Sequence, residues 1–202
     1  MLFRSSLVSV RIPETVNSIG AGAFQGCTQL ERITLPDRCR IIPQKAFSGC
    51  SSLESISFSP LVRKIEAAAF EGCESLLEIV LPAGITEIPA SMLSGCSSLT
   101  SLSIPASVAS IDRQAFMDCS SLESLELPAG ITRIREETFK GCSRLEDLVL
   151  PSTLRHVDEG AFRGFDAAIA LTIPNGVTSI EREAFADCAR MESLVIPDSV
   201  AV

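Results

Sequence analysis

Eight cysteines and a single histidine are the side chains of this 202-residue chain best suited to chemistry. Seven of the cysteines are spaced at multiples of 23 residues, so each repeat holds one thiol and no Cys-x-x-Cys pair occurs. Metal sites need ligands that converge, typically from such close pairs. The single file of thiols therefore predicts neither a metal site nor a cofactor. These cysteines are Cys27, Cys50, Cys73, Cys96, Cys119, Cys142 and Cys188.

Disulfide bonds are a second option for the same thiols. If repeats stack about 5 Å apart, equivalent cysteines fall within the Cα separation that a disulfide accepts. Stacked equivalent side chains point the same way, however, which suits that bond poorly. We favour buried thiols that act as small core residues, and we interpret Cys39, which occupies an apolar position of the repeat, in the same way.

Catalysis by a Ser-His-Asp or Cys-His arrangement would have to use His156, the only histidine. His156 directly precedes the apolar Val157 and is followed by Asp158, which indicates a solvated side chain on the outer side of a short strand. The paired carboxylates Glu136 and Glu137 fall at an expected helix start, where acidic side chains are favourable without any catalytic role. We expect no catalytic residue and no enzyme activity.

The elements that position these side chains recur eight times with a period of 23 residues. A fixed period of this length indicates a solenoid, in which each coil buries its apolar face only against its neighbours. We expect one such domain over residues 1–202, with about eight repeats. Prolines mark the period at Pro13, Pro36, Pro82, Pro105, Pro128, Pro151, Pro174 and Pro197, with Ser59 in the missing place. Phenylalanines follow at Phe24, Phe47, Phe70, Phe116, Phe139, Phe162 and Phe185, with Leu93 in the gap.

One repeat predicts three elements. Ile33 and Leu35 alternate with polar residues, which is typical of a half-buried strand, and the following proline ends that strand. Val16 and Ile19 predict a second, shorter extended piece. The segment 20–27 predicts a short helical turn that exits through a glycine, since glycine tolerates positive φ. Eight coils at about 4.8 Å each give a parallel sheet about 40 Å long.

The recurring text Ile-Pro-x-x-Val-x-x-Ile-x-x-x-Ala-Phe-x-Gly-Cys-x-x-Leu-x-x-Ile resembles the BspA-like class of leucine-rich repeats, from Leu7 to Val200. The resemblance implies an α/β solenoid with a parallel sheet on one face, and short strands and helical turns on the other. Members of the class occur on the surface of, or are secreted by, bacteria and parasitic protists. The resemblance thus implies adhesion or binding to another protein, and a surface or secreted location.

One repeat departs from the pattern. Phe165 takes the cysteine position and Ala168 the leucine position, which predicts that a larger side chain compensates a smaller one in the core. An alternative is that Ile169 and Ala170, at positions that are usually polar, form an apolar contact patch on the outer face.

Composition excludes several partners. The formal net charge of −8 argues against nucleic acid and anionic membranes, which need clustered Lys and Arg. The chain has no Trp and no Tyr, so a base-stacking platform is not expected. No segment reaches the ~18 apolar residues of a membrane span, and we expect no secretory signal within these residues. The chain starts within a repeat, which favours a fragment of a longer protein.

The outward face of the predicted sheet is the candidate binding surface. Its side chains are small, which predicts a flat face without deep pockets for a metabolite. An acidic row beside it would steer a basic partner, or it forms a solvated rim partly neutralised by Arg144 and Arg190. The candidate partner-binding residues are Glu78, Ser101, Ser124, Glu123, Glu146, Asp147 and Ile169.

Basic side chains gather on the opposite side, where they are either solubilising or able to dock an acidic surface. They are Arg38, Arg40, Arg63 and Lys64 in one group, and Arg133, Arg135, Arg155 and His156 in the other.

Two functions remain. The first is a protein-binding module that uses a solenoid face. The second is a structural spacer or assembly subunit joined end to end through its open coils. Interfaces are usually rich in Tyr and Trp; their absence weakens the first hypothesis relative to the second.

Overall fold

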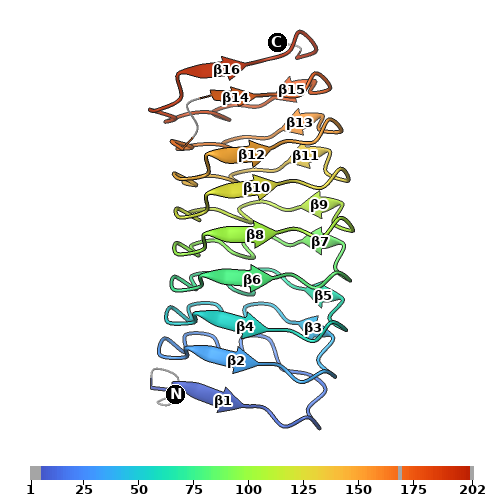
Figure 1. Ribbon diagram of the computed structural model, residues 1–202, viewed down its shortest axis with the longest axis vertical. Coiled ribbons are helices and arrows are strands. Elements are labelled where there is room, and N and C mark those ends of the chain that lie inside the picture. Colours follow the sequence, from blue (N-terminus) through green and yellow to red (C-terminus); the bar gives the residue numbers. More distant parts are fainter. Residues whose placement is uncertain (1–5, 168–169, 201–202) are drawn as a thin grey trace.

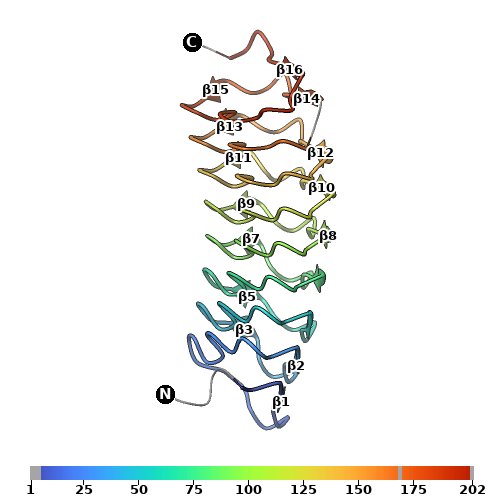
Figure 2. The same ribbon diagram turned by 90° about the vertical axis from the view of Figure 1, so that its left-hand side faces the viewer.

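The computed structural model describes residues 6–167 and 170–200, and they form one continuous stack of coils. Each coil takes 23 residues, so residues one period apart lie above one another (Figure 1). The chain rises from β1 at one end to β16 at the other without folding back (Figure 2). The solenoid predicted from the repeat is confirmed.

One face of the stack carries three-residue parallel strands. The central residue of each strand points into the core and the flanking residues point outward, as the alternation predicts. The strands are β1 (Ser9–Arg11), β2 (Arg32–Thr34), β4 (Ser55–Ser57), β6 (Glu78–Val80), β8 (Ser101–Ser103), β10 (Ser124–Glu126), β12 (Asp147–Val149), β14 (Ala170–Thr172) and β16 (Ser193–Val195). We call this surface the sheet face.

The second predicted extended piece is also present, as two-residue strands behind the sheet face. Each ends at the apolar position that Ile19 occupies in the first repeat. The strands are β3 (Ile41–Ile42), β5 (Lys64–Ile65), β7 (Glu87–Ile88), β9 (Ser110–Ile111), β11 (Arg133–Ile134), β13 (His156–Val157) and β15 (Ser179–Ile180).

The ladder of the sheet face is not continuous. Strands β1, β2 and β4 form one sheet. Strands β6, β8, β10 and β12 form a second, and β14 and β16 form a third. Within the second sheet, β8 and β10 pair only through Ser101 and Ser124, whereas β6 and β8 pair along their whole length. The coils therefore stack along the whole solenoid, but the strand pairing is lost between β4 and β6 and between β12 and β14, and it is reduced between β8 and β10.

The helical turn predicted over residues 20–27 and its equivalents is not confirmed, because the described residues contain no helix. Backbone N–H groups there alternate between two kinds of acceptor. Ala46 N–H bonds within its own coil to Pro43 O, 3.1 Å, whereas Lys45 N–H bonds to Ala67 O of the next coil, 3.1 Å. A helix would direct all of these donors along its own axis. The segment instead forms consecutive β-turns that are fixed by the neighbouring coil.

Positive φ angles explain the turn geometry. All of them in the described residues fall in two columns, each with one residue per coil. The column predicted as a glycine exit is confirmed, for example at Gly49 (φ 74°) and Gly72 (φ 70°). The second column was not predicted, because most of its residues are not glycine. Its non-glycine members are Lys45, Ala68, Ser91, Gln114, Glu137 and Glu183.

The interior consists of ladders of like residues. Phe24, Phe47 and Phe70 stack with ring centroids 5.5 Å apart, and a second stack starts at Phe116 and continues through Phe139. Among these, Phe70 and Phe139 are fully buried, as the repeat predicts.

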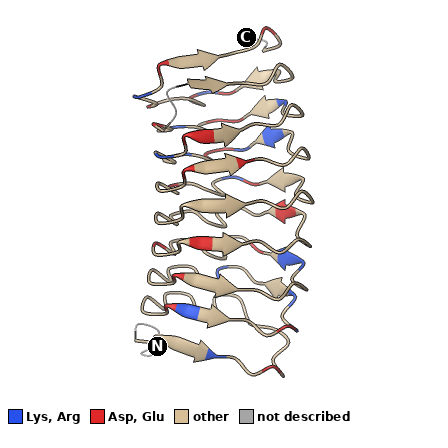
Figure 3. Cartoon of the chain, in the orientation of Figure 1, with Lys and Arg blue, Asp and Glu red and all other residues tan. Residues whose placement is uncertain are grey.

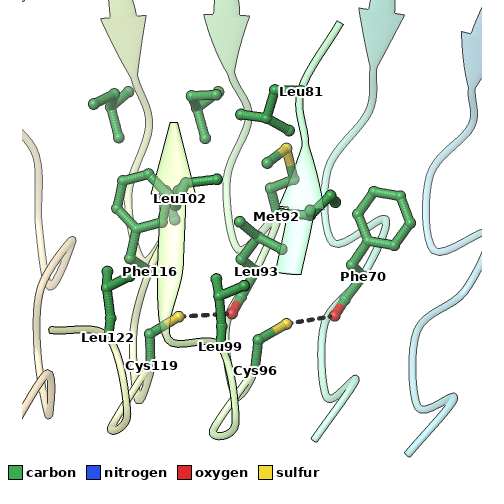
Figure 4. Close-up of a cluster of buried hydrophobic side chains, with 14 of the residues drawn as sticks. Phe70, Leu81, Met92, Leu93, Cys96, Leu99, Leu102, Phe116, Cys119 and Leu122 are labelled. Atoms are coloured by element: carbon green, nitrogen blue, oxygen red, sulfur yellow. Dashed lines mark hydrogen bonds between the residues drawn. The ribbon is translucent and has the colours of Figure 1, made fainter. Parts of the chain in front are cut away.

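Leu93 interrupts the phenylalanine ladder, and Met92 compensates it. Met92 occupies a position held by alanine in most repeats, and both side chains are fully buried. They lie together between Phe70 and Phe116 (Figure 4). Met92 is larger than the usual alanine and Leu93 is smaller than the usual phenylalanine, so the total side-chain volume of this coil is nearly conserved. Protein interiors tolerate such a swap better than a change in total volume.

Phe165 lies in the cysteine column and is fully buried, with its ring edge-on to that of Phe162 at 5.6 Å. Its predicted compensating partner Ala168, and Ile169 beside it, lie outside the described residues.

The cysteine column has a hydrogen-bonding role that the sequence did not indicate. Each thiol from Cys50 onward donates to the backbone carbonyl at the phenylalanine position of the preceding coil, as Cys96 does to Phe70 O, 3.3 Å, and Cys119 to Leu93 O, 3.2 Å (Figure 4). These side chains are buried, as predicted, except for Cys188, which is half-buried. The thiols therefore tie successive coils together as well as filling space.

An alternation of two coil types runs through the second half of the chain. Gly84, Gly130 and Gly176 occupy one turn position in alternate coils, and Ser107, Thr153 and Ser199 occupy it in the coils between them. The Thr153 hydroxyl lies 2.8 Å from both carbonyl oxygens that flank Gly130, those of Ala129 and Ile131. On its other side, a Cβ at Gly130 would lie only 3.0 Å from Val108 O.

Candidate protein-binding face

Four candidate residues form one exposed row on the sheet face. Glu78, Ser101, Ser124 and Asp147 are the first residues of β6, β8, β10 and β12, and the parallel register places each opposite the next. The row is straight because every repeat has the same length. The structure therefore brings these four predicted residues together across adjacent strands.

Glu123 and Glu146 lie directly before β10 and β12, beside this row. Their side chains are exposed, while the backbone is held by bonds such as Asp147 N–H to Glu123 O, 3.2 Å. Glu126, at the end of β10, adds a further exposed carboxylate. We call Glu78, Glu123, Glu126, Glu146 and Asp147 the acidic strip. Figure 3 shows acidic segments in red on several strands of this face. The remaining candidate, Ile169, lies outside the described residues.

Ion pairs are unequally distributed: one, between Arg32 of β2 and Glu54 beside β4, lies on the sheet face, and the other contacts lie elsewhere on the stack. Among the described residues eight ion-pair contacts occur, and none includes a member of the acidic strip. The predicted neutralisation by Arg144 and Arg190 is thus not seen as direct contacts in this part of the chain. Like charges on adjacent strands repel one another. A cationic partner would relieve that repulsion.

The predicted basic clusters are largely occupied within the protein. Arg63 Nη1 donates to the backbone carbonyls of Pro60, 2.7 Å, and Val62, 3.0 Å, and Arg155 caps its own turn in the same way. Arg133 pairs with Asp158, 2.7 Å. Arg63 and Arg155 thus cap their own turns and Arg133 pairs with another coil, whereas Arg38 and Arg40 of the first cluster make no side-chain hydrogen bond or ion pair within the described residues.

His156 is half-buried, and its Nδ1 lies 2.9 Å from the Ser179 hydroxyl of the next coil. The nearby Asp158 carboxylate is engaged by Arg133 rather than by the imidazole. The pair stabilises the contact between two coils, and the geometry of a triad is not formed at Asp158.

Thiol chemistry is suppressed by burial. Loss of solvation raises the pKa of the Cys50 and Cys119 thiols to about 12, and raises the pKa of Cys96 and Cys142 well above the ordinary value. Because the thiolate is the reactive and metal-binding form, these side chains are inert at neutral pH. In the part of the chain that the structure describes, no three His, Cys, Asp or Glu side chains converge as metal ligands.

Three grooves interrupt the flat face predicted from its small side chains. The smallest, of about 300 Å³, lies between β1 and β2, which pair along their whole length, and the other two lie where the strand pairing is lost or reduced. The larger, of about 620 Å³, opens between β4 and β6, which do not pair. Its lining includes Phe58, Ser59, Val80 and Leu81. A second groove, of about 360 Å³, opens between β8 and β10 beside Glu126. Sequence reasoning missed all three, although Ser59 in the proline position marked the largest.

The described residues include no helix with the length and apolar character needed to cross a bilayer.

Comparison with known proteins places these features in a wider group. The family described as BspA type leucine-rich repeat region matches the chain in six copies, over residues 2–122 and 86–202. No curated protein matches. A crystal structure of a leucine-rich repeat protein from T. pallidum is similar at 37% identity, with a TM-score of 0.70, over 74% of this chain and 70% of that one.

The pneumococcal vaccine antigen PcpA shares the fold at 20% identity, with a TM-score of 0.55. The similarity covers 85% of this chain and 52% of the PcpA chain, so the present chain corresponds to about half of that structure.

Proposed function

Because the chain belongs to the BspA-type leucine-rich repeat family, whose solenoids commonly serve protein interaction or adhesion, we propose that it is a non-enzymatic binding module for another protein. The sheet face receives the partner, and the partner presents a basic surface. A cell-surface or secreted location, typical of the family, accompanies this role.

The observation that carries this proposal is the contrast in charge pairing. Eight carboxylates elsewhere among the described residues contact Arg or Lys, as Glu159 does with Arg182 of the next coil at 2.7 Å. The acidic strip has no such contact within the described residues. Complementary charge speeds encounter with a basic partner and selects its orientation. The small serines between the carboxylates leave the strip open to close approach.

The test compares charge reversals on two faces. Proteins captured by the immobilised chain are identified, purified, and measured by surface plasmon resonance against Glu123→Lys/Glu146→Lys. The matched control is Glu87→Lys/Glu136→Lys, which changes the same charge at exposed carboxylates away from the sheet face. We expect the first variant to lose at least about tenfold in affinity, chiefly through the association rate, and the control to bind normally.

Equal binding by the two variants would remove the sheet face from the proposal. Self-association of the chain into end-to-end assemblies that neither variant disturbs, seen by analytical ultracentrifugation, would instead support a spacer or assembly subunit.

A further inference from the structure

The sheet is interrupted where two successive residues depart from the repeat. Phe58 takes a position held by leucine or isoleucine in the other repeats, and Ser59 takes the proline position. The Phe58 ring lies edge-on to the buried Phe70 at 5.7 Å, and the Ser59 hydroxyl accepts a hydrogen bond from Leu61 N–H, 3.1 Å. The Phe58 ring therefore packs against the core, and Ser59 is only 2% exposed, so this corner of the coil is turned inward. The ladder from β4 to β6 is absent at the same level.

The inward corner leaves the largest of the grooves on this face. Its volume of about 620 Å³ compares with about 360 Å³ between β8 and β10, where one pair of residues still joins the strands. Seven of the eleven lining residues are apolar, among them Ile56, Phe58, Pro60, Leu81 and Pro82. A groove of this size and lining accepts a whole apolar side chain.

The rim adds exposed apolar surface at the same level. Val80, which lines the groove, is 78% exposed, and Leu77, which directly precedes β6 and is not part of the lining, is 54% exposed. Single exposed apolar side chains are ordinary, but the highly exposed Val80 lines an apolar groove. Together they favour an apolar occupant that covers both rim and groove.

Charge then selects the kind of occupant. Glu78 is the single titratable residue in the lining, and no ion pair among the described residues includes it. It also begins the acidic strip, which continues from β6 to β12. An occupant with a cationic group next to its apolar one satisfies both features.

We propose that the groove between β4 and β6 anchors an apolar side chain of a partner protein segment, and that an adjacent Lys or Arg of this segment pairs with Glu78. The inference rests on the proposed function, because the groove opens onto the same face as the acidic strip. It adds a chemical signature: an aliphatic or aromatic residue flanked by basic residues.

The experiment uses two synthetic peptides, acetyl-Lys-Lys-Leu-Lys-Lys-amide and its counterpart with glycine in place of leucine. Binding is followed by the methyl NMR signals of the isotope-labelled chain. The leucine peptide is expected to bind about fivefold more tightly, the gain from burying roughly half of a leucine side chain. The Val80, Leu81 and Ile56 methyl signals should shift only with that peptide.

Two test variants are each paired with a matched control variant. Ser57→Phe fills the groove from β4, and Thr172→Phe makes the same change at the equivalent exposed position of β14. Glu78→Gln removes the pairing charge, and Glu87→Gln removes an equal charge from β7. We expect Ser57→Phe to abolish the leucine preference and Glu78→Gln to weaken both peptides, whereas the two controls bind like the parent chain.

Each other outcome overturns the inference in a recognisable way. If both peptides bind equally, with shifts confined to the acidic strip, the groove is not an anchor and the proposed function stands. If neither peptide binds, both proposals fail. If the groove signals shift only with protein concentration, and Ser57→Phe reverses this, the occupant is a second copy of the chain and the proposed partner segment is wrong.

Discussion

At the scale of single residues, the cysteine column shows how one position serves two purposes. The thiol is small enough for the interior, and it also donates to a carbonyl that already accepts a bond in its own turn, as Phe70 O does from both Cys73 N–H and the Cys96 thiol. A buried carbonyl with two lone pairs gains a second partner in this way. Alanine or valine would fill the space without the hydrogen bond.

This chemistry predicts loss of stability at alkaline pH. Burial raises the folded-state pKa of Cys50 and Cys119 from 9.0 to about 12, so the stabilising contribution of each thiol is complete below pH 9 and is lost as pH rises toward 12. We expect the free energy of unfolding to fall by about 1.4 kcal/mol per thiol for each pH unit above 9. Guanidinium unfolding in reducing buffer at pH 7.5, 9 and 10.5 measures this decrease in the free energy of unfolding.

The variant Cys96→Ala supplies the control, because Cys96 is fully buried and its removal should flatten this pH dependence by one thiol. Identical slopes in the variant and the parent chain would show that the buried thiols do not govern alkaline stability.

The exchange of volume at Met92 and Leu93 gives a second prediction. Met92→Ala should cost about 2–5 kcal/mol by leaving a cavity, and Leu93→Phe about 1–3 kcal/mol by overpacking. The double variant restores the residue types of neighbouring coils, so it should lie close to the parent chain, with a favourable coupling energy of about 2 kcal/mol or more. Urea unfolding of the four proteins provides the cycle. Additive losses would mean that the two side chains do not share one space.

At the scale of elements, the turn is determined by neighbours rather than by local propensity. The second positive-φ column contains lysine, alanine, serine, glutamine and glutamate, which give no sign of a left-handed backbone. All of these except Glu183 donate the backbone N–H to the next coil, as Ser91 N–H does to Arg113 O, 3.0 Å. Local sequence therefore predicted a helical turn, and contacts between coils produce β-turns instead. The glycine column, by contrast, was predictable because glycine marks positive φ directly.

The same geometry predicts a stabilising change at Lys45. This residue is exposed and has φ 55°, a conformation that costs a residue with Cβ about 1 kcal/mol more than glycine. Lys45→Gly should therefore raise the free energy of unfolding by about 0.5–1 kcal/mol. Lys45→Ala, which removes the same charge but keeps a Cβ, should leave stability unchanged within error. Thermal unfolding of both variants measures the change in the free energy of unfolding. An equal gain in both variants would show that the effect comes from removing the charge and not from the backbone conformation.

At the scale of the whole molecule, each coil depends on the coils on either side. Phe116 is fully buried in the stack, whereas Phe185, which packs on Phe162 at 5.1 Å, is half-buried in this chain. Solenoid stability is approximately a sum over repeats and their interfaces. The cost of one deletion should therefore depend on where in the stack it falls.

We expect Phe116→Ala to cost about 3–5 kcal/mol, and Phe185→Ala roughly half as much because its environment is already partly open to water. Urea unfolding with matched m-values gives both numbers. A cost below about 1 kcal/mol for Phe116→Ala would contradict a packed ladder at that position.

Sequence periodicity was sufficient for the architecture and for which residues lie on each face, because a 23-residue repeat fixes the register of every strand. It placed Glu78, Ser101, Ser124 and Asp147 in one row. It was not sufficient for the grooves, since the loss of pairing between β4 and β6 depends on how Phe58 and Ser59 turn inward. It also did not reveal which carboxylates pair with cations, because that depends on side-chain reach between coils.

The alternation of glycine and hydroxyl turns has a consequence for how such a chain can change length. A glycine turn such as that at Gly130 fits between coils that carry Ser107 and Thr153, so the smallest self-consistent module is a pair of coils, 46 residues. Removing or duplicating one coil in this half would set two glycine turns, or two hydroxyl turns, against each other. Adding coils in pairs would preserve every such contact, so we expect the solenoid to lengthen by two coils at a time.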